Sequence, residues 1–187
     1  MQPDDLEIIE SIRKGNSADF SLLVDRYKNR AYSMLCRMLK DDMDAEEVLQ
    51  DCFLKAFNAL NNFKGDSKFS TWFYRIVYNT AITVISAKKR KIEKEISSID
   101  DHFNLKSELD INVTEKKDIA EFIHTMIDRL PEKYAAVINL YYLDGMSCDE
   151  ISNVMDTSLS NVKVILFRSR NALKDLLIKY SYSEELL

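Results

Sequence analysis

The feature that most constrains the fold of this chain is the scarcity of residues that interrupt a helix. Its 187 residues include only three Gly and two Pro, the two residue types that most weaken a helix interior. Between them, apolar residues recur at intervals of three and four, as in Phe20, Leu23, Tyr27 and Ala31. That period is typical of an amphipathic helix and not of a strand. The sequence therefore predicts an all-α protein.

The helical pattern falls into two parts. The helices that we expect cover residues 5–14, 17–39, 44–60 and 70–90 in the first part, and 115–129, 131–143 and two further helices after Gly145 in the second. Residues 94–113 between the two parts are acidic and polar and lack a period, which is typical of a flexible linker. We therefore expect an N-terminal domain over residues 1–93 and a C-terminal domain over residues 114–187.

The last two helices of the C-terminal domain have the pattern of a helix-turn-helix. Ser147 and Glu150 form a capping box that starts a short helix, and Ser158 is placed to cap the longer helix that follows. We expect that helix to bury an apolar side made of Leu159, Val162, Leu166, Leu173, Leu176 and Leu177. An ordinary helical hairpin fits the same pattern, so shape alone leaves both interpretations open.

In a helix-turn-helix, the N-terminal part of the second helix enters the major groove of DNA. Asn pairs well with adenine, and Lys reaches guanine or phosphate. Arg side chains further along the helix suit phosphate contacts. The candidate DNA-contacting residues of this helix are Ser160, Asn161, Lys163, Val164, Phe167, Arg168 and Arg170.

A second candidate site lies in residues 62–75, where aromatic residues alternate with basic and small polar ones. Aromatic faces stack on unpaired bases, and polar groups in a loop read base edges. The alternative is that Trp72, Phe69 and Phe73 belong to the core, and for Trp72 alone this is the better interpretation. The basic run at 88–91 is equally compatible with a solvated helix end, where cations favour the helix dipole.

The charge distribution keeps nucleic-acid binding possible. The net charge of −5 and the isoelectric point near 5.2 argue against it for the chain as a whole. However, residues 61–95 carry 8 basic and 3 acidic side chains, whereas residues 96–128 carry 3 basic and 8 acidic ones. Phosphate contacts need only a local basic surface.

Residues 41–51 are the most acidic segment of the first half. Asp44 followed by Glu47 resembles a capping box and predicts the start of the third helix at Asp44. The remaining carboxylates exceed what capping needs, which favours a basic protein partner. The alternative is that these carboxylates only stabilise the helix, through their favourable interaction with the helix dipole at its N-terminus. A metal or acid–base site is not supported, because no His or Gly-rich loop lies nearby.

Other residue types exclude several classes of protein. Cys36, Cys52 and Cys148 are too widely spaced for a zinc site, and their odd number suits reduced thiols. His102 and His124 stand alone. No apolar run approaches the length of about 18 residues that a membrane span needs, and the acidic N-terminus is not a signal peptide. We expect a cytoplasmic protein that is not an enzyme and binds no cofactor or metal.

Three segments of the chain resemble extracytoplasmic-function (ECF) sigma factors of the sigma-70 family. Residues 44–53 are similar to the helix of that family that docks on core RNA polymerase, and residues 63–81 to its minus-ten loop and helix. Residues 130–151 and 160–170 are similar to its minus-thirty-five-binding module. The resemblance implies three partners: core RNA polymerase, through its β′ clamp coiled coil and β subunit, promoter DNA and an anti-sigma factor. It implies no small-molecule substrate.

The resemblance also implies a role for individual residues. The docking surface would consist of Asp44, Glu46, Glu47, Gln50, Asp51 and Phe53. The minus-ten surface would hold a flipped base in its loop and help to open the duplex, through Phe63, Lys64, Asp66, Ser67, Phe69, Trp72, Arg75, Asn79, Thr80, Lys88, Lys89 and Arg90. The last long helix would read the minus-thirty-five element.

The chain departs from the family pattern at two places. Ile165 stands where the family often has Arg, which removes a DNA-contacting donor, whereas Val164 suits a thymine methyl group. Ala135 and Ala136 stand beside another frequent Arg position. The minus-thirty-five sequence therefore cannot be copied from relatives.

Two other functions remain as alternatives. A free-standing helix-turn-helix regulator would bind operator DNA as a dimer without polymerase, and would leave the acidic helix and the Trp72 loop without a role. A helical protein that sequesters another factor would show no dependence on DNA.

Overall fold

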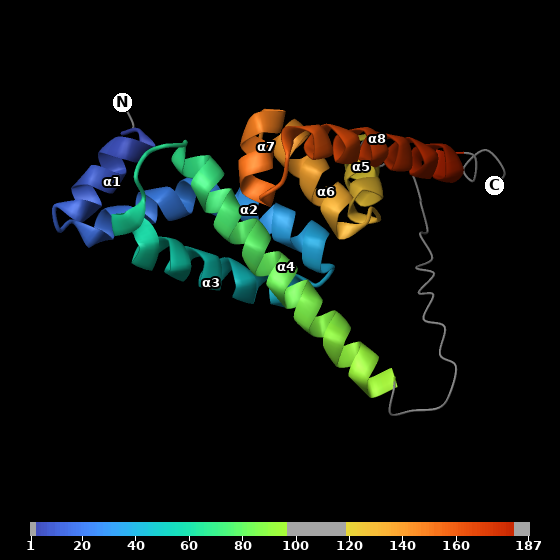
Figure 1. Ribbon diagram of the computed structural model, residues 1–187, viewed down its shortest axis with the longest axis horizontal. Helices are drawn as coiled ribbons and strands as arrows, with labels where there is room; N and C mark the ends of the chain where they lie inside the picture. Colours follow the sequence, from blue (N-terminus) through green and yellow to red (C-terminus); the bar gives the residue numbers. More distant parts are fainter. Residues whose placement is uncertain (1–2, 97–118, 182–187) are drawn as a thin grey trace.

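The computed structural model describes residues 3–96 and 119–181, and all of the regular structure in these two ranges is helical (Figure 1). The all-α prediction is confirmed. Residues 97–113 of the predicted linker lie outside the described residues. The predicted helix at 115–129 is described only from Ile119 onward.

The N-terminal part is built from four α-helices and two short 3-10 turns. Its elements are α1 (Asp5–Arg13), η1 (Ser17–Asp19), α2 (Phe20–Leu39), α3 (Asp42–Ala59), η2 (Leu60–Asn62) and α4 (Phe69–Ile96). Helices α2, α3 and α4 pack on one another, and α1 packs on the start of α2. Helix α4 extends three residues into the segment that we expected to be linker.

The start of α3 differs from the prediction. Lys40 ends α2 in the left-handed region, with φ 59°, and the extended residue Asp41 then caps α3. The Asp41 carboxylate accepts a hydrogen bond from the backbone N–H of Asp44 at 2.9 Å. The prediction that Asp44 and Glu47 start this helix is therefore wrong, because the chain offers an equally good capping carboxylate three residues earlier.

The C-terminal part contains α5 (Ile119–Asp128), α6 (Glu132–Ile138), the π-helical turn η3 (Asn139–Leu143), α7 (Cys148–Met155) and α8 (Leu159–Ser181). Both predicted caps are confirmed. Ser147 and Glu150 form the capping box of α7, and the Ser158 hydroxyl accepts the backbone N–H of Asn161 at 3.2 Å. Helices α7 and α8 therefore form the expected helix-turn-helix.

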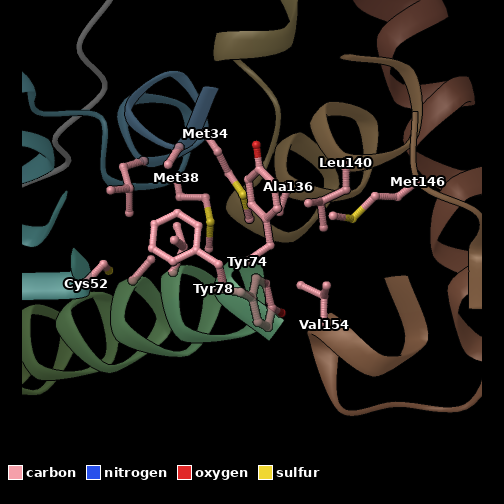
Figure 2. Packing of buried hydrophobic residues seen from close by; sticks show 14 of the residues in the cluster. Met34, Met38, Cys52, Tyr74, Tyr78, Ala136, Leu140, Met146 and Val154 are labelled. Carbon is pink, nitrogen blue, oxygen red and sulfur yellow. The ribbon is translucent and has the colours of Figure 1, made fainter. Parts of the chain in front are cut away.

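The two parts are packed directly against each other. Helix α7 lies on α4, and α6 lies on α2. In this interface Met34, Met38, Tyr74 and Tyr78 of the N-terminal part share one continuous core with residues of the C-terminal part, including Ala136, Leu140, Met146 and Val154 (Figure 2). The sequence predicted two domains but gave no reason to expect a shared core.

Candidate nucleic-acid and polymerase interfaces

The outward face of α8 has the residues that a major-groove reader needs. Ser160, Asn161, Lys163 and Val164 are all exposed in its first turns, and Phe167 is 63% exposed one turn later. Val162, Leu166 and Ser169 on the opposite side are buried. The prediction that Leu159 belongs to the buried side of this helix is wrong, because its side chain is 39% exposed. Leu159 is the first residue of α8.

Two arginines follow on the same helix. Arg168 is exposed, and no ion pair reaches it from the described residues. The Arg170 Nε donates a hydrogen bond to the Tyr142 hydroxyl at 2.7 Å, and its guanidinium lies 5.4 Å from the centre of the Tyr141 ring. Arg170 is therefore held by the domain, whereas Arg168 is free to turn towards a phosphate.

The predicted base pocket before α4 is built on an aromatic cluster. Phe63 and Phe69 are buried, and their ring centres lie 5.3 Å and 5.6 Å from that of half-buried Trp72. The Arg13 guanidinium donates hydrogen bonds to the carbonyls of Leu60 and Phe63, which ties the loop to α1. These Phe rings support the loop from beneath and do not face solvent.

The exposed part of this site is polar. Lys64, Asp66 and Ser67 are exposed around Gly65, whose φ of 81° suits glycine. Arg75 and Asn79 are exposed on α4, while Thr80 is buried and its hydroxyl accepts a hydrogen bond from Lys55 at 3.3 Å. Thr80 therefore lies beneath the surface that DNA would meet.

The basic end of α4 is partly engaged with other elements. Lys88 forms an ion pair with Asp44 of α3. Lys89 forms one with Glu132 of α6 at 3.2 Å. The Arg90 Nε donates to the carbonyl of Ser86 in the same helix at 3.2 Å.

The acidic face of α3 is largely exposed. Glu46, Glu47 and Gln50 point to solvent, and Asp51 forms an ion pair with Lys55 one turn later at 2.7 Å. Phe53 is different, because it is buried and stacks on Phe73 with ring centres 4.8 Å apart. Phe53 shapes the helix from inside and is not itself available to a partner.

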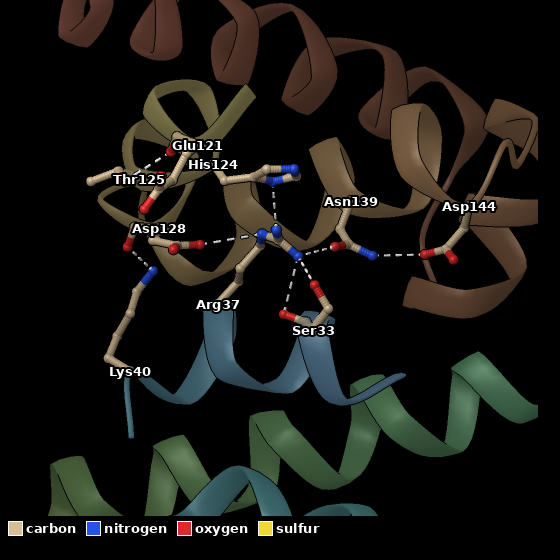
Figure 3. Close-up of polar contacts among 9 residues, drawn as sticks. All are labelled: Ser33, Arg37, Lys40, Glu121, His124, Thr125, Asp128, Asn139 and Asp144. Atoms are coloured by element: carbon tan, nitrogen blue, oxygen red, sulfur yellow. Dashed lines mark hydrogen bonds and ion pairs between the residues drawn. The ribbon is translucent and has the colours of Figure 1, made fainter. Parts of the chain in front are cut away.

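The structure reveals a buried polar group that sequence reasoning did not single out. Arg37 on α2 is buried at the interface between the two parts (Figure 3). Its guanidinium donates to the Asn139 side-chain oxygen at 2.8 Å, contacts His124 Nδ1 at 2.9 Å and pairs with Asp128 at 3.2 Å. The signal was available, since Arg37 interrupts the apolar side of its helix between Met34 and Met38.

The same polar network continues to α4. The Asn139 amide donates to one oxygen of Asp144 at 2.7 Å (Figure 3), and the Tyr74 hydroxyl donates to the other at 2.7 Å. Burial raises the pKa of Asp144, and burial together with Asp144 raises that of Tyr74. This network of Arg37, Asn139, Asp144 and Tyr74 thus joins helices α2 and α4 of the N-terminal part to the C-terminal part.

Neither metal chemistry nor a membrane span is indicated where the structure is described. Within residues 3–96 and 119–181 no group of three or more His, Cys, Asp or Glu side chains is arranged to hold a metal ion. No helix in these ranges is both long and apolar enough to cross a membrane. All three cysteines are free.

Comparison with solved structures shows the same fold in other proteins. CnrH in complex with the cytosolic domain of CnrY has a TM-score of 0.64 at 22% identity, covering 92% of this chain and 96% of that one. The sigma factor RpoE in complex with the anti-sigma factor NepR from Bartonella quintana has a TM-score of 0.64 at 19% identity, covering 85% and 96%.

Comparison of sequences shows the family. Residues 23–91 match Sigma-70 region 2, and residues 121–173 match Sigma-70, region 4. The RNA polymerase sigma-H factor of Pseudomonas aeruginosa is 31% identical over 179 residues, which cover 92% of this chain and 93% of the relative. The ECF RNA polymerase sigma-E factor of Escherichia coli K12 is 33% identical with the same coverage. The chain therefore belongs to the sigma-70 family and is an ECF sigma factor, a subunit that binds RNA polymerase and directs promoter recognition.

Proposed function

We propose that this sigma factor divides its work between two domains, with residues 1–93 docking on polymerase and holding the minus-ten element and residues 114–187 reading the minus-thirty-five element. The observation that carries this proposal is the outward face of α8. Lys163, Val164, Phe167 and Arg168 stand exposed on one side of a helix whose other side is core. A stable monomer gains little from exposing a large aromatic ring between two cations. A DNA groove offers phosphates that suit the two cations and thymine methyl groups that suit the aromatic ring.

The loop before α4 and the first turns of that helix are the proposed minus-ten site. Lys64, Asp66 and Ser67 supply exposed polar groups, and Trp72 is half-buried beside them. A base that leaves the duplex needs a stacking surface and partners for its edge. Phe63, Phe69 and Thr80 act from beneath, by fixing the loop and the helix that carries Arg75 and Asn79. Holding an unpaired base in this way favours promoter melting.

The acidic face of α3 is the proposed contact with the β′ clamp coiled coil. Glu46, Glu47 and Gln50 are exposed, and Asp44 and Asp51 lie at their edge. A row of carboxylates suits a basic partner surface, and complementary charge mainly raises the association rate and fixes orientation. Because Phe53 is buried, we assign it to the support of this surface.

The protein acts by binding and not by catalysis, and it works where RNA polymerase is, in the cytoplasm. One solved relative of the same fold is a sigma factor in complex with an anti-sigma factor. We therefore include an anti-sigma factor among the partners of this chain.

The test is run-off transcription with purified core polymerase on genomic fragments that include the protein's own upstream region. We expect new discrete transcripts that need this protein. Asp51→Lys should lower their yield by more than tenfold, because it places a cation in the acidic docking face. Asp25→Lys is the matched control, since Asp25 forms a similar exposed pair with Lys28 on α2, and it should leave the yield unchanged.

Equal loss with Asp51→Lys and Asp25→Lys would contradict the docking surface. Absence of any transcript, together with tight binding of operator DNA by the protein alone, would contradict the sigma mechanism in this chain and favour a free-standing regulator.

A further inference from the structure

Arg13, the last residue of α1, reaches the segment that connects α3 to α4. One terminal nitrogen of its guanidinium, Nη2, donates hydrogen bonds to the carbonyl oxygen of Leu60 at 2.9 Å and to that of Phe63. Leu60 is the first residue of the turn η2, and Phe63 follows its end. A single charged side chain thus holds two backbone oxygens that lie 47 and 50 positions further along the chain.

These two carbonyls lie where a helix leaves its acceptors without a partner. The last carbonyl groups of a helix cannot be bonded by the helix itself, and α3 ends at Ala59. Phe63 is extended, with ψ 112°, so its own carbonyl leaves the helical hydrogen-bond pattern. A charged donor makes a stronger hydrogen bond than a neutral one. Arg13 therefore fixes the backbone at the point where the helix ends and the loop begins.

The loop that starts there carries the exposed polar part of the proposed minus-ten site. Residues 64–67 are exposed and follow directly after Phe63. At the other end of the loop, the carbonyl of Lys68 accepts the backbone N–H of Trp72, in the first turn of α4, at 3.2 Å. The loop is thus held by Arg13 where it begins and by α4 where it ends.

We propose that Arg13 is a positioning residue of promoter recognition, which sets the place of the minus-ten loop for an unpaired base. The inference rests on the proposed function of that loop. Arg13 acts through the Phe63 carbonyl and makes no contact with the base. Because the carbonyl is held towards α1, the polar groups of residues 64–67 start from a fixed point beside Trp72.

The aromatic cluster beneath the loop does not supply this orientation. The Phe63 ring packs against Phe69 and Trp72, but burial of an apolar ring is a non-directional interaction. The ring can stay buried while the backbone beside it turns. A hydrogen bond depends steeply on direction, so the bonds from Arg13 fix the direction of the backbone that the ring leaves free.

Helix α1 is a firm support for this contact. At its opposite end, Asp5 forms an ion pair with Arg26 and accepts a hydrogen bond from the Tyr27 hydroxyl, both on α2. Between the two ends, α1 packs on α2. In Figure 1 the connection from α3 to α4 passes beside α1. A displacement of Arg13 would therefore need the whole helix to move.

The first experiment replaces Arg13 in the full chain and uses run-off transcription with core polymerase. One template is a promoter that the unaltered protein transcribes, and the other carries the single minus-ten substitution that lowers its transcript most. The ratio of the two yields measures selectivity. Arg13→Gln should lower this ratio about tenfold, because the amide ends two bonds short of Nη2 and the carbonyls lose their charged donor.

The conservative variant Arg13→Lys should restore part of the ratio. Both bonds come from the same nitrogen, and an ammonium group with three donors reproduces that arrangement better than an amide does. If Arg13→Gln gives no transcript from either template, the ratio is measured on Arg13→Lys and should lie below that of the unaltered protein. A ratio equal to that of the unaltered protein in both variants would overturn the proposal.

Two controls carry the same change in charge as Arg13→Gln. Lys14→Gln removes an exposed cation at the next position, which forms no ion pair with the described residues. Arg26→Gln breaks the ion pair at the opposite end of α1. Both should keep the ratio within about twofold of the unaltered protein. An equal loss with Arg26→Gln would overturn the proposal, because attachment of α1 in general would then explain it.

The second experiment needs neither DNA nor polymerase. Hydrogen–deuterium exchange with mass spectrometry follows a peptide covering residues 60–70, which includes the Phe63 N–H that bonds to the Leu60 carbonyl at 3.1 Å. We expect Arg13→Gln to speed exchange in this peptide about tenfold and to leave α7 and α8 unchanged. Unchanged exchange in the peptide, or an equal increase throughout the chain, would overturn the proposal.

The two experiments separate the possible failures. Faster exchange with an unaltered transcript ratio would overturn the positioning role and leave Arg13 as a structural contact only. Absence of any transcript with the unaltered protein would reject the proposed function, and the inference with it. Transcription by the unaltered protein together with an unaltered ratio in the Arg13 variants would reject this inference alone.

Discussion

The two surfaces that we propose as DNA contacts differ in the contacts that they make within the protein. The reading face of α8 carries Lys163 and Arg168 without an ion-pair partner among the described residues, and Phe167 stands exposed between them. The surface of α4 is engaged, with Lys68 and Arg75 paired to α7 and its aromatic rings packed beneath the loop. The cations of the first surface are unpaired among the described residues, whereas two cations of the second form ion pairs with the C-terminal part and remain exposed to solvent.

The difference has a physical reason in the way each surface recognises DNA. Reading a duplex through the major groove depends on base edges and is specific. Stacking of unpaired bases on aromatic rings tolerates any sequence. We therefore expect the proposed minus-ten surface to be the less sequence-selective of the two.

The sharpest test of the comparison replaces the same residue type on the two surfaces. Phe69→Ala should lower the free energy of unfolding by about 4 kcal/mol, because its buried ring packs on Phe63, Trp72 and Phe73. Phe167→Ala should cost less than about 0.5 kcal/mol, because that ring is exposed. Urea unfolding measures both. Similar costs would contradict the assignment of Phe69 to support and Phe167 to reading.

The interface between the domains is tested through Arg37. Arg37→Ala leaves Asn139, His124 and Asp128 without their shared partner and should cost about 3 kcal/mol of unfolding free energy. Arg37→Lys should restore only part of this, because one ammonium group cannot reproduce the planar fork of donors. Lys28→Ala on the exposed side of the same helix is the control, and a loss as large as that of Arg37→Ala would argue against a special role of the interface.

The reading face of α8 is tested by the salt dependence of its DNA binding. Lys163→Ala with Arg168→Ala should weaken binding of a promoter duplex carrying the minus-thirty-five element by about tenfold. It should also reduce the slope of log affinity against log salt concentration by about 2, provided that each cation contacts a phosphate. Fluorescence anisotropy at several salt concentrations measures the slope. Lys174→Ala, further along α8, is the control, and an equal change in slope there would show that the effect is not local.

The smallest effect concerns pH. The hydrogen bond from Lys68 and that from the Ser147 backbone lower the pKa of Glu150 below its ordinary value of 4.5. A carboxylate with a lowered pKa stabilises the folded protein fully above its unfolded-state pKa and loses this contribution as the pH falls through the folded-state value. The unaltered protein should therefore lose about 0.5 kcal/mol below pH 4.5 that Glu150→Gln does not lose. Urea unfolding of both proteins at pH 6 and below pH 4 measures the difference, and parallel profiles would reject the Lys68–Glu150 pair.

The helices and their ends were largely determined by local sequence. The apolar period gave the helical class, and the Ser147–Glu150 box and Ser158 marked the helix-turn-helix correctly. These signals are short-range, because a cap or a helix turn involves residues three or four apart. The start of α3 was predicted wrongly because two residues, Asp41 and Asp44, are equally good caps by local sequence. The left-handed turn at Lys40 places Asp41 at the start of the helix.

Which residues of the candidate sites meet solvent was decided only by tertiary structure. The sequence identified Phe53, Phe63, Phe69 and Thr80 by their motifs but did not show that all four are buried. The sequence pattern around an aromatic residue is the same whether its ring is buried beneath a binding surface or exposed on it. Only the packing of α1, α3 and α4 around these side chains separates the two roles.

The packing of the two domains against each other could not be predicted from the sequence. Arg37 and Asn139 are separated by 102 positions, and no local rule connects an arginine in one helix to an amide in another domain. Composition and periodicity determined that the chain forms two helical modules with a basic segment and an acidic one. Tertiary structure decided that carboxylates of the second module lie on cations of the first, because long-range packing alone brings such residues within a few ångströms of each other.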